Sequence, residues 1–158
     1  MKSSTRFAIV VCIVLTASCA GTSPQMHAAP SEKTPAAAKG GDKLYRALGG
    51  DAGITRVVDA TLKEIHGDLR INFFFEKTDM ADLRRLLIEQ ICAATGGPCT
   101  YSGRSMEEAH SGLNLTDADF DAFVDDLVRA MNSQKVPAEL QKELLGLLGP
   151  MRPQVVGQ

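Results

Sequence analysis

Apolar residues recur every three or four positions over most of the chain after position 43, which is the spacing of one face of an α-helix. No segment alternates between apolar and polar residues over a useful length, so β-strands are not expected. The pattern predicts an all-α fold with four principal helices and several short ones. The four expected apolar stripes are Ile54, Val57, Val58, Thr61, Leu62 and Ile65; Leu83, Leu86, Leu87, Gln90 and Ile91; Phe120, Phe123, Leu127 and Met131, with Val124 beside them; and Leu140, Leu144, Leu147 and Leu148.

Capping and helix-breaking residues set the expected helix ends. A first short helix near Lys43 should end at the Gly49-Gly50 pair, because glycine tolerates the left-handed conformation. Asp51, Asp79 and Thr116 carry the side chains that cap helix N-termini, and each is expected to begin a principal helix. The other boundaries are expected at His66-Gly67-Asp68, Thr95-Gly96-Gly97-Pro98, Val136-Pro137 and Gly149-Pro150, with a short helical turn over Ile71–Phe75.

Residues 1–18 have the composition of a secretory signal, with Lys2 and Arg6 before an apolar run and small residues after it. The apolar run is too short to span a bilayer as a mature helix. The Leu-Thr-Ala-Ser-Cys stretch that ends at Cys19 resembles a bacterial lipoprotein box, in which the cysteine is acylated and anchors the mature chain to a membrane. The alternative is ordinary cleavage after Ala20. Both alternatives predict an exported protein of the cell envelope or periplasm.

Residues 19–41 are rich in glycine, proline, serine and alanine and hold few large apolar side chains, which predicts a flexible tether. The globular domain is expected over residues 42–158. A chain of 158 residues leaves room for one domain with a real core. Its net charge is −2, and acids and bases are interleaved without a basic stripe, so a nucleic-acid partner is not expected.

A series of special residues follows a specific order along this domain. Phe73-Phe74-Phe75 precedes a helix and is followed by Gly96-Gly97-Pro98-x-x-Tyr101-x-Gly103-Arg104-x-Met106-x-x-Ala109-His110, then by Leu113-x-Leu115-Thr116, Phe120 and Val136-Pro137. Over about residues 43 to 156 the series resembles the group 1 truncated haemoglobins, and an early Leu-Tyr-x-x-Leu-Gly-Gly phrase supports this. The resemblance implies a truncated globin-like two-over-two helical sandwich that clamps haem between its helix pairs.

The resemblance also implies the residues that hold the haem. His110 matches the proximal ligand, the one side chain bonded to iron, and a neutral imidazole is a suitable axial ligand. Without the motif, a lone histidine among apolar residues is more often merely packed or solvated, and a phenylalanine cluster is more often plain core. The other matched positions are Phe75, which packs flat against the porphyrin, Phe74 beside it, Tyr101 and Met106 on the proximal side, and Thr78 and Met80 at the haem edge.

The distal side departs from the family pattern. Group 1 members commonly place a tyrosine on the second helix and a glutamine on the third, and an ungapped match puts Leu62 and Leu87 there, with Leu83 one turn before Leu87. With leucines at these matched positions, we expect an apolar ligand pocket. A hydrogen bond to a charged group contributes about 1.5–3 kcal/mol, and bound dioxygen carries partial negative charge. We expect the site to hold dioxygen less firmly than its tyrosine-bearing relatives do, with carbon monoxide and nitric oxide less affected.

Four further polar or sulfur-bearing residues bear on the chemistry. Cys92 and Cys99 could form a disulfide in an oxidising compartment, or they could remain two buried thiols. No Cys-x-x-Cys-His motif is present, which predicts noncovalent haem b. His66 lies near the expected end of a helix, where a solvated or dipole-stabilising position competes with a role at the haem edge. His27, in the tether, is expected to be solvated.

Two classes of function are compatible with these features. The first is a non-enzymatic haem protein that transports, stores or senses a diatomic gas such as O2, NO or CO. The second is a haem enzyme, such as a nitric oxide dioxygenase or a peroxidase-like protein, although an apolar pocket lacks the acid–base group that peroxidase chemistry needs. A haem-free interaction domain is a third reading. The residues indicate neither a redox partner nor the physiological ligand.

Overall fold

The computed structural model describes residues 41–158, and the expected signal, the acylated Cys19 and all of the expected tether except Gly41 lie outside these residues. The described part is all-helical and contains no strand. None of its helices is long and apolar enough to cross a membrane. In chain order the elements are α1 (Lys43–Ala47), α2 (Gly50–Gly67), the 3-10 helix η1 (Asn72–Phe75), α3 (Met80–Ala94), α4 (Met106–His110), α5 (Asp117–Ser133), α6 (Ala138–Leu148) and the 3-10 helix η2 (Gly149–Gln154).

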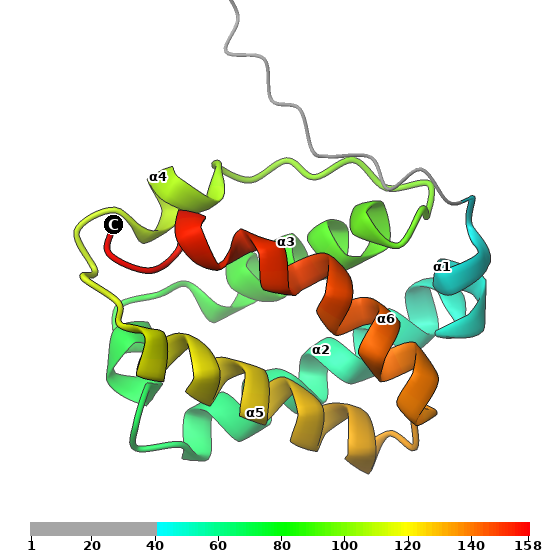
Figure 1. Ribbon diagram of the computed structural model, residues 1–158, viewed down its shortest axis with the longest axis horizontal. Coiled ribbons are helices and arrows are strands. Elements are labelled where there is room, and N and C mark those ends of the chain that lie inside the picture. The colour runs from blue at the N-terminus through cyan, green and yellow to red at the C-terminus, as the bar shows by residue number, and fades with distance from the viewer. Residues whose placement is uncertain (1–40) are drawn as a thin grey trace, which may run out of the picture. The chain divides into compact units, whose positions relative to one another are not determined.

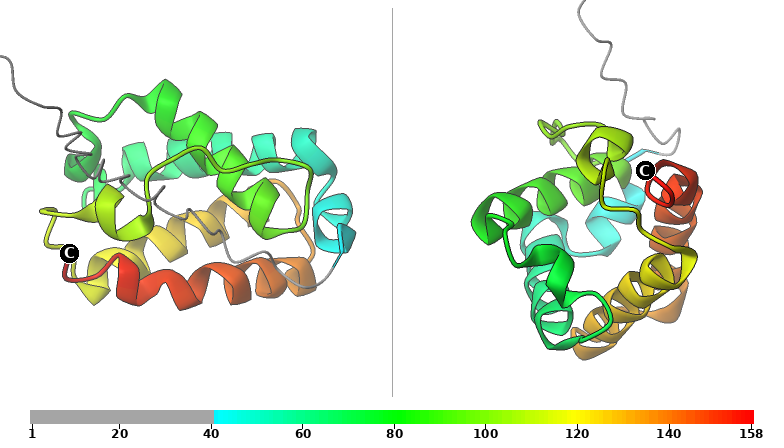
Figure 2. Two further views of the ribbon diagram at one scale, coloured as in Figure 1. Left: turned by 90° about the horizontal axis from the view of Figure 1, so that it is seen from above. Right: turned by 90° about the vertical axis from the view of Figure 1, so that its left-hand side faces the viewer.

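The four long helices predicted from the sequence pattern are present, and they form the two-over-two arrangement that the family resemblance implies (Figure 1). Helix α2 packs against both α3 and α5, and α6 continues into η2 across the other side of the domain (Figures 1 and 2). The buried face of α2 carries the expected stripe, with Ile54, Val58 and Ile65 each about 1% exposed. These side chains join residues of α3, α5 and α6 in two neighbouring apolar clusters, which set the spacing between the helix pairs.

Two of the three expected helix caps are confirmed, and the third is wrong. The Asp79 carboxylate accepts hydrogen bonds from two backbone N–H groups of α3, and Thr116 forms a capping box with Asp119 at the start of α5. Asp51, in contrast, lies inside the first turn of α2, because the helix begins at Gly50. Gly49 has φ +93° and turns the chain directly from α1 into α2, so the helix starts before the expected aspartate cap.

A disulfide between Cys92 and Cys99 ties the end of α3 to the loop that leads toward α4. The Cys92 side chain is fully buried, and Cys99 is half-buried. The bond closes a short loop around the Gly96-Gly97 turn, which restricts the unfolded chain more than the folded one.

Replacing both cysteines by serine is expected to lower the free energy of unfolding by about 2–3 kcal/mol, from the loop-closure entropy of so short a ring. Denaturant unfolding of the wild type and of the Cys92→Ser/Cys99→Ser variant measures the difference. A thiol reductant should shift the wild type toward the variant and leave the variant unchanged. A wild type whose stability does not respond to reductant would contradict a stabilising disulfide.

A buried carboxylate lies where α5 packs against the end of α2. The Asp126 side chain is 0% exposed, and its Oδ2 atom has no hydrogen-bond partner in the protein. Burial raises the pKa of Asp126 to about 6, with the nearby Asp68 adding to the shift and the Arg129 guanidinium opposing it. The hydrogen bonds from Arg70 hold the pKa of Asp68 well below its usual range, so Asp68 stays charged and Asp126 is the group that takes up a proton.

Asp126 is expected to make stability fall as pH rises from about 4 to 6. Across that window the folded protein binds a proton at Asp126 that the unfolded chain has released, since the ordinary pKa is 3.8. Asp126→Asn should therefore stabilise the protein at pH 7 by about 1–3 kcal/mol, and the gain should vanish below pH 4. Unfolding measured against pH checks this. Asp125→Asn, an exposed neighbour paired with Arg70, is the matched control and should change stability little. A constant difference between Asp126→Asn and wild type at every pH would contradict the assignment.

Candidate functional site

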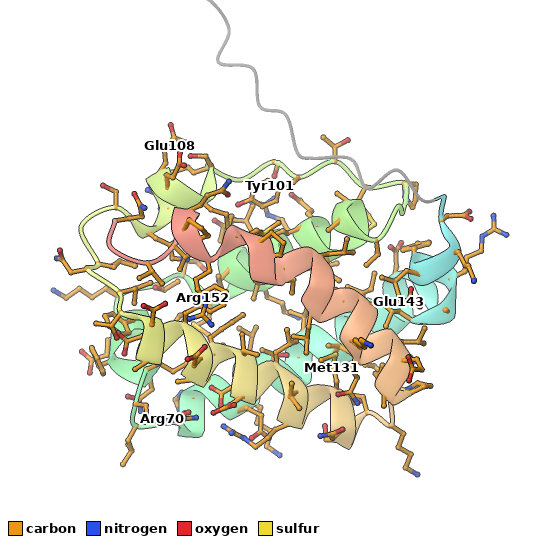
Figure 3. All side chains as sticks on the ribbon, in the orientation of Figure 1. Arg70, Tyr101, Glu108, Met131, Glu143 and Arg152 are labelled. Carbon is orange, nitrogen blue, oxygen red and sulfur yellow. A yellow bond between two sulfur atoms is a disulfide. The ribbon has the colours of Figure 1, made fainter. Side chains whose placement is uncertain are left out.

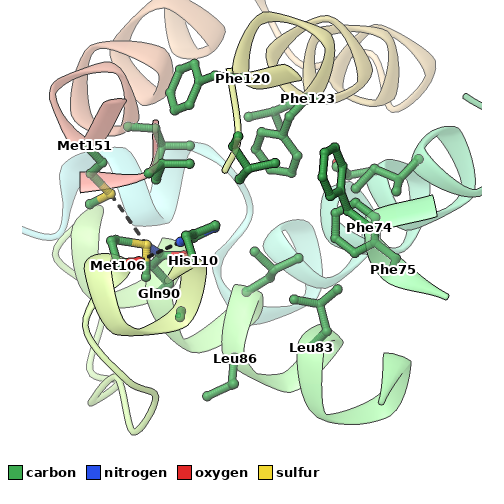
Figure 4. A pocket seen from close by; sticks show the side chains of 18 of the residues that line it. Phe74, Phe75, Leu83, Leu86, Gln90, Met106, His110, Phe120, Phe123 and Met151 are labelled. Atoms are coloured by element: carbon green, nitrogen blue, oxygen red, sulfur yellow. Dashed lines mark hydrogen bonds between the residues drawn. The ribbon is translucent and has the colours of Figure 1, made fainter. Parts of the chain in front are cut away.

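A cavity of about 680 Å³ lies inside the domain, within the range of sites that enclose a small-molecule ligand or cofactor. Every helix except α1 contributes to its wall, and most of the lining side chains are aliphatic or aromatic. Phe74 and Phe75 stand at one end, and His110 and Met106 face them from another side, with Phe120 and Phe123 above (Figure 4). The arrangement can hold a flat apolar group between the aromatic end and the histidine.

The local sequence positions His110 on the cavity wall. Ser105 and Glu108 form a capping box that begins the short helix α4, and His110 is its last residue. The His110 ring lies with Nδ1 2.6 Å from the backbone oxygen of Met106. A carbonyl oxygen only accepts hydrogen bonds, so Nδ1 carries a proton and this contact leaves Nε2 free. His110 is half-buried and lines the cavity, so it offers the cavity an imidazole held in one orientation.

Most of the residues that the sequence assigned to the site meet at this cavity, and two do not. Met80 is 37% exposed at the start of α3 and does not line the wall. Leu62 packs against both core clusters instead of the cavity, because the face of α2 that reaches the cavity carries Val58, Thr61 and Ile65. His66 is exposed at the end of α2 and is not part of the wall. The assigned residues that line the cavity are His110, Phe74, Phe75, Tyr101, Met106, Thr78, Leu83 and Leu87.

Comparison with known proteins decides what kind of site this is. A model of the bacterial-like globin family matches residues 43–156. The chain belongs to the bacterial-like globins. A group 1 truncated hemoglobin from a Nostoc species is 38% identical over 109 residues, which cover 69% of this chain and 92% of that protein. One from Mycolicibacterium paratuberculosis is 30% identical over 112 residues, covering 71% of this chain and 82% of that protein.

Solved structures give the same assignment. The Fe(III) form of a truncated hemoglobin from Tetrahymena pyriformis superimposes with a TM-score of 0.71 at 29% identity, covering 73% of this chain and 98% of that one. A 2/2 hemoglobin from Synechococcus, solved in the cyanomet state with covalently attached heme, has a TM-score of 0.68 at 32% identity and covers 73% of this chain and 98% of that one. The globin family implies haem binding, and the residues present fit it, since the cavity combines apolar walls with an oriented histidine imidazole.

Tyr101 shows how the Tyr-x-Gly stretch of this globin shapes the wall. Its hydroxyl donates a hydrogen bond to the backbone oxygen of Arg104 at 2.9 Å. Burial raises the pKa of Tyr101, which keeps the phenol protonated and able to donate. A side chain at Gly103 would place its Cβ 2.2 Å from the Tyr101 oxygen, so the glycine is required for the ring to lie against the turn. Tyr101 therefore contributes its ring to the cavity wall, while its hydroxyl is engaged by the backbone of Arg104.

Sequence reasoning missed two groups of lining residues. Gln90 was counted in the apolar stripe of α3, but its side-chain amide lies 3.2 Å from the Met106 sulfur and 3.5 Å from the Met151 sulfur, beside His110 (Figure 4). Its position as a polar residue within an apolar stripe was the sequence signal that could have identified Gln90 as a site residue. The second group is cationic and consists of Lys77, Arg104 and Arg152.

Arg152 is the most firmly held of these cations. Figure 3 labels Arg152 among the side chains of the domain. Its guanidinium lies 4.4 Å from the centre of the Phe120 ring and pairs with Asp117 at 2.8 Å and with Asp121. These carboxylates raise the pKa of Arg152, which stays charged. Its charge is balanced by these two carboxylates, and the wall also includes Asp79, Asp82 and Asp119, so the mainly apolar cavity carries charged side chains of both signs.

Proposed function

We propose that this globin holds noncovalent haem b in the cavity, with His110 as the axial ligand, and reversibly binds a diatomic gas. The orientation of the His110 imidazole carries the proposal, because its Nδ1–H group bonds to the Met106 carbonyl and its Nε2 lone pair remains available to iron. Haem, when bound, supplies an iron atom with a free coordination position for O2, NO or CO. The family assignment supports haem binding by this chain.

Side chains of the chain itself determine which gas is favoured. Leu83 and Leu87 line the cavity from α3, the helix on which the sequence places the ligand side of the site. Neither can donate a hydrogen bond. The Thr61 hydroxyl is already committed to the backbone oxygen of Val57 at 2.8 Å, and Gln90 lies beside the proximal residues. We therefore expect a water-poor pocket that holds dioxygen weakly, which favours transport, storage or sensing of a gas over oxygen-dependent catalysis.

A haem titration tests the proposal. The protein is expected to bind one haem, to give a His-ligated globin absorption spectrum after reduction with dithionite, and to bind CO. Extraction with acidified organic solvent should remove the haem completely if it is haem b. Protein that takes up no haem would leave only a globin fold, and haem that resists extraction would show a covalent attachment like that of the Synechococcus protein.

We further propose that the protein is an exported lipoprotein, acylated at Cys19, with the globin domain held near a membrane by residues 19–41. The signal-like composition of residues 1–18 and the lipoprotein-like stretch before Cys19 support this. Cell fractionation tests it. Wild type should sediment with membranes and incorporate a labelled fatty acid, and Cys19→Ser should do neither. Protein that remains in the cytoplasm would contradict export, and soluble exported wild type would favour cleavage after Ala20.

A further inference from the structure

A second group of potential ligands lies outside the cavity, at the opposite end of α3 from its N-cap. Asp51 comes from the first turn of α2, Cys92 from the last turn of α3 and Cys99 from the loop that follows. The Asp51 Oδ1 atom lies 3.8 Å from the sulfur of Cys92 and 3.8 Å from that of Cys99. None of the three residues lines the haem cavity. The cluster is thus independent of the proposed haem site.

The position of the Asp51 carboxylate is not explained by the disulfide. Disulfide sulfurs have no proton to donate, so they give this carboxylate no hydrogen bond. The Tyr45 hydroxyl does donate a hydrogen bond to Oδ1, at 2.9 Å. Tyr45 therefore holds Asp51 against the two sulfurs, much as outer-shell hydrogen bonds orient the carboxylate ligands of metal sites.

The distances match a tetrahedral zinc site in which the two sulfurs are no longer bonded to each other. Zinc binds thiolate sulfur at about 2.3 Å and carboxylate oxygen at about 2.0–2.2 Å, which places neighbouring ligand atoms roughly 3.5–3.8 Å apart. The Asp51 oxygen already has this separation from both sulfurs, and all three ligand atoms lie within 4.8 Å of one another. Only the sulfurs must separate. The half-buried Cys99, on a loop, has more freedom to move than the fully buried Cys92.

We propose that the reduced form of Cys92 and Cys99 binds one Zn²⁺ ion together with Asp51, with water as the fourth ligand. A dithiol reductant supplies two electrons and two protons, the Cys92–Cys99 bond breaks, and the reductant becomes a disulfide. Zn²⁺ then displaces one proton from each thiol and binds two thiolates and one carboxylate. Two soft sulfur ligands and one oxygen ligand favour zinc over magnesium or calcium. Disulfide formation and zinc binding exclude each other, so the thiol redox state of the compartment that holds the protein selects between them.

Calorimetric titration of the full chain with Zn²⁺ tests this site. The reduced wild type is expected to bind one more equivalent of Zn²⁺ than reduced Cys92→Ser/Cys99→Ser, which retains Cys12, Cys19 and every histidine. The oxidised wild type should behave like that double variant. Equal stoichiometry for the reduced wild type and the double variant would overturn the proposal.

The role of Asp51 needs its own variant, because the cysteines alone could bind the ion. Asp51→Asn keeps an oxygen that can accept from Tyr45 but loses the charge, and it should weaken Zn²⁺ binding at least tenfold. Asp59→Asn, an exposed aspartate two turns along the same helix, is the matched control and should bind as wild type does. Equal affinity in Asp51→Asn and wild type would remove Asp51 from the site. Bound Zn²⁺ should also slow alkylation of Cys92 and Cys99, measured by mass spectrometry, and unchanged alkylation rates would count against the site.

The zinc and haem proposals fail separately. Zinc binding is measured by stoichiometry and alkylation, with no haem signal, and its ligands do not touch the cavity. A chain that binds haem but no zinc keeps the proposed function and loses this inference. The reverse result would keep the zinc site and reject the proposed function.

Discussion

His110→Ala is expected to weaken haem binding by more than about 100-fold and to abolish the His-ligated spectrum of the reduced protein. The 2.6 Å contact between Nδ1 of His110 and the Met106 oxygen orients the ring, so that Nε2 remains free to act as a ligand. Loss of even an outer-shell partner typically costs a metal site 10–100-fold in affinity, and loss of the ligand itself should cost more. The apolar walls remain in the variant, so we expect it still to take up haem weakly, without the His-ligated spectrum.

His66→Ala is the matched control for this experiment. His66 is exposed and lies outside the cavity wall, so its replacement should change neither haem affinity nor the spectrum. Added imidazole should restore a nitrogen-ligated spectrum to His110→Ala, because that substitution opens space at the cavity wall. A normal ligated spectrum in His110→Ala, or its loss in His66→Ala, would assign the iron to another side chain.

Leu87→Gln is expected to slow dioxygen dissociation by about 10–100-fold while changing CO dissociation much less. The substitution places an amide donor on the cavity wall at nearly constant side-chain volume. A hydrogen bond to a charged partner contributes about 1.5–3 kcal/mol, and bound dioxygen carries more negative charge than bound CO. Stopped-flow or flash-photolysis kinetics on the haem-loaded protein measure both rates.

Leu69→Gln provides the comparison, since Leu69 is 84% exposed and does not line the cavity. Its oxygen dissociation rate should equal that of wild type. If Leu87→Gln left the oxygen rate unchanged, or if the wild type already released oxygen as slowly as the variant, the pocket would contain a donor other than those described and the proposed discrimination against oxygen would be wrong.

The periodicity of apolar residues was sufficient to predict the long helices, because each of them buries one apolar face. Asp79 and Thr116 could be predicted as caps, since their side chains act on backbone groups within three residues. Asp51 could not. Its position depends on the left-handed Gly49 and on contacts with Tyr45 and two cysteines that are distant in sequence.

Two features of the site could not be predicted from the sequence. One is the direction in which each helix face points, and the other is contacts between residues that are distant in sequence. A motif match fixes residue order, but one residue along a helix changes the facing direction by about 100°. Leu62 therefore packs in the core while Thr61, one residue before it, reaches the cavity wall. Arg152 was missed because its role arises from Phe120, Asp117 and Asp121, which lie more than thirty positions earlier. The burial of Asp126 was also missed, although a polar residue on the apolar face of α5 was an available signal, as it was for Gln90.

A crystal structure of the haem-loaded protein would show directly where the haem and its ligand lie. We expect haem within the cavity, iron bonded to Nε2 of His110, the Nδ1 contact to the Met106 oxygen retained, and Phe75 against the porphyrin, with leucines of α3 around the gas position. Iron bonded to a different side chain, or haem bound outside this cavity, would contradict this expectation.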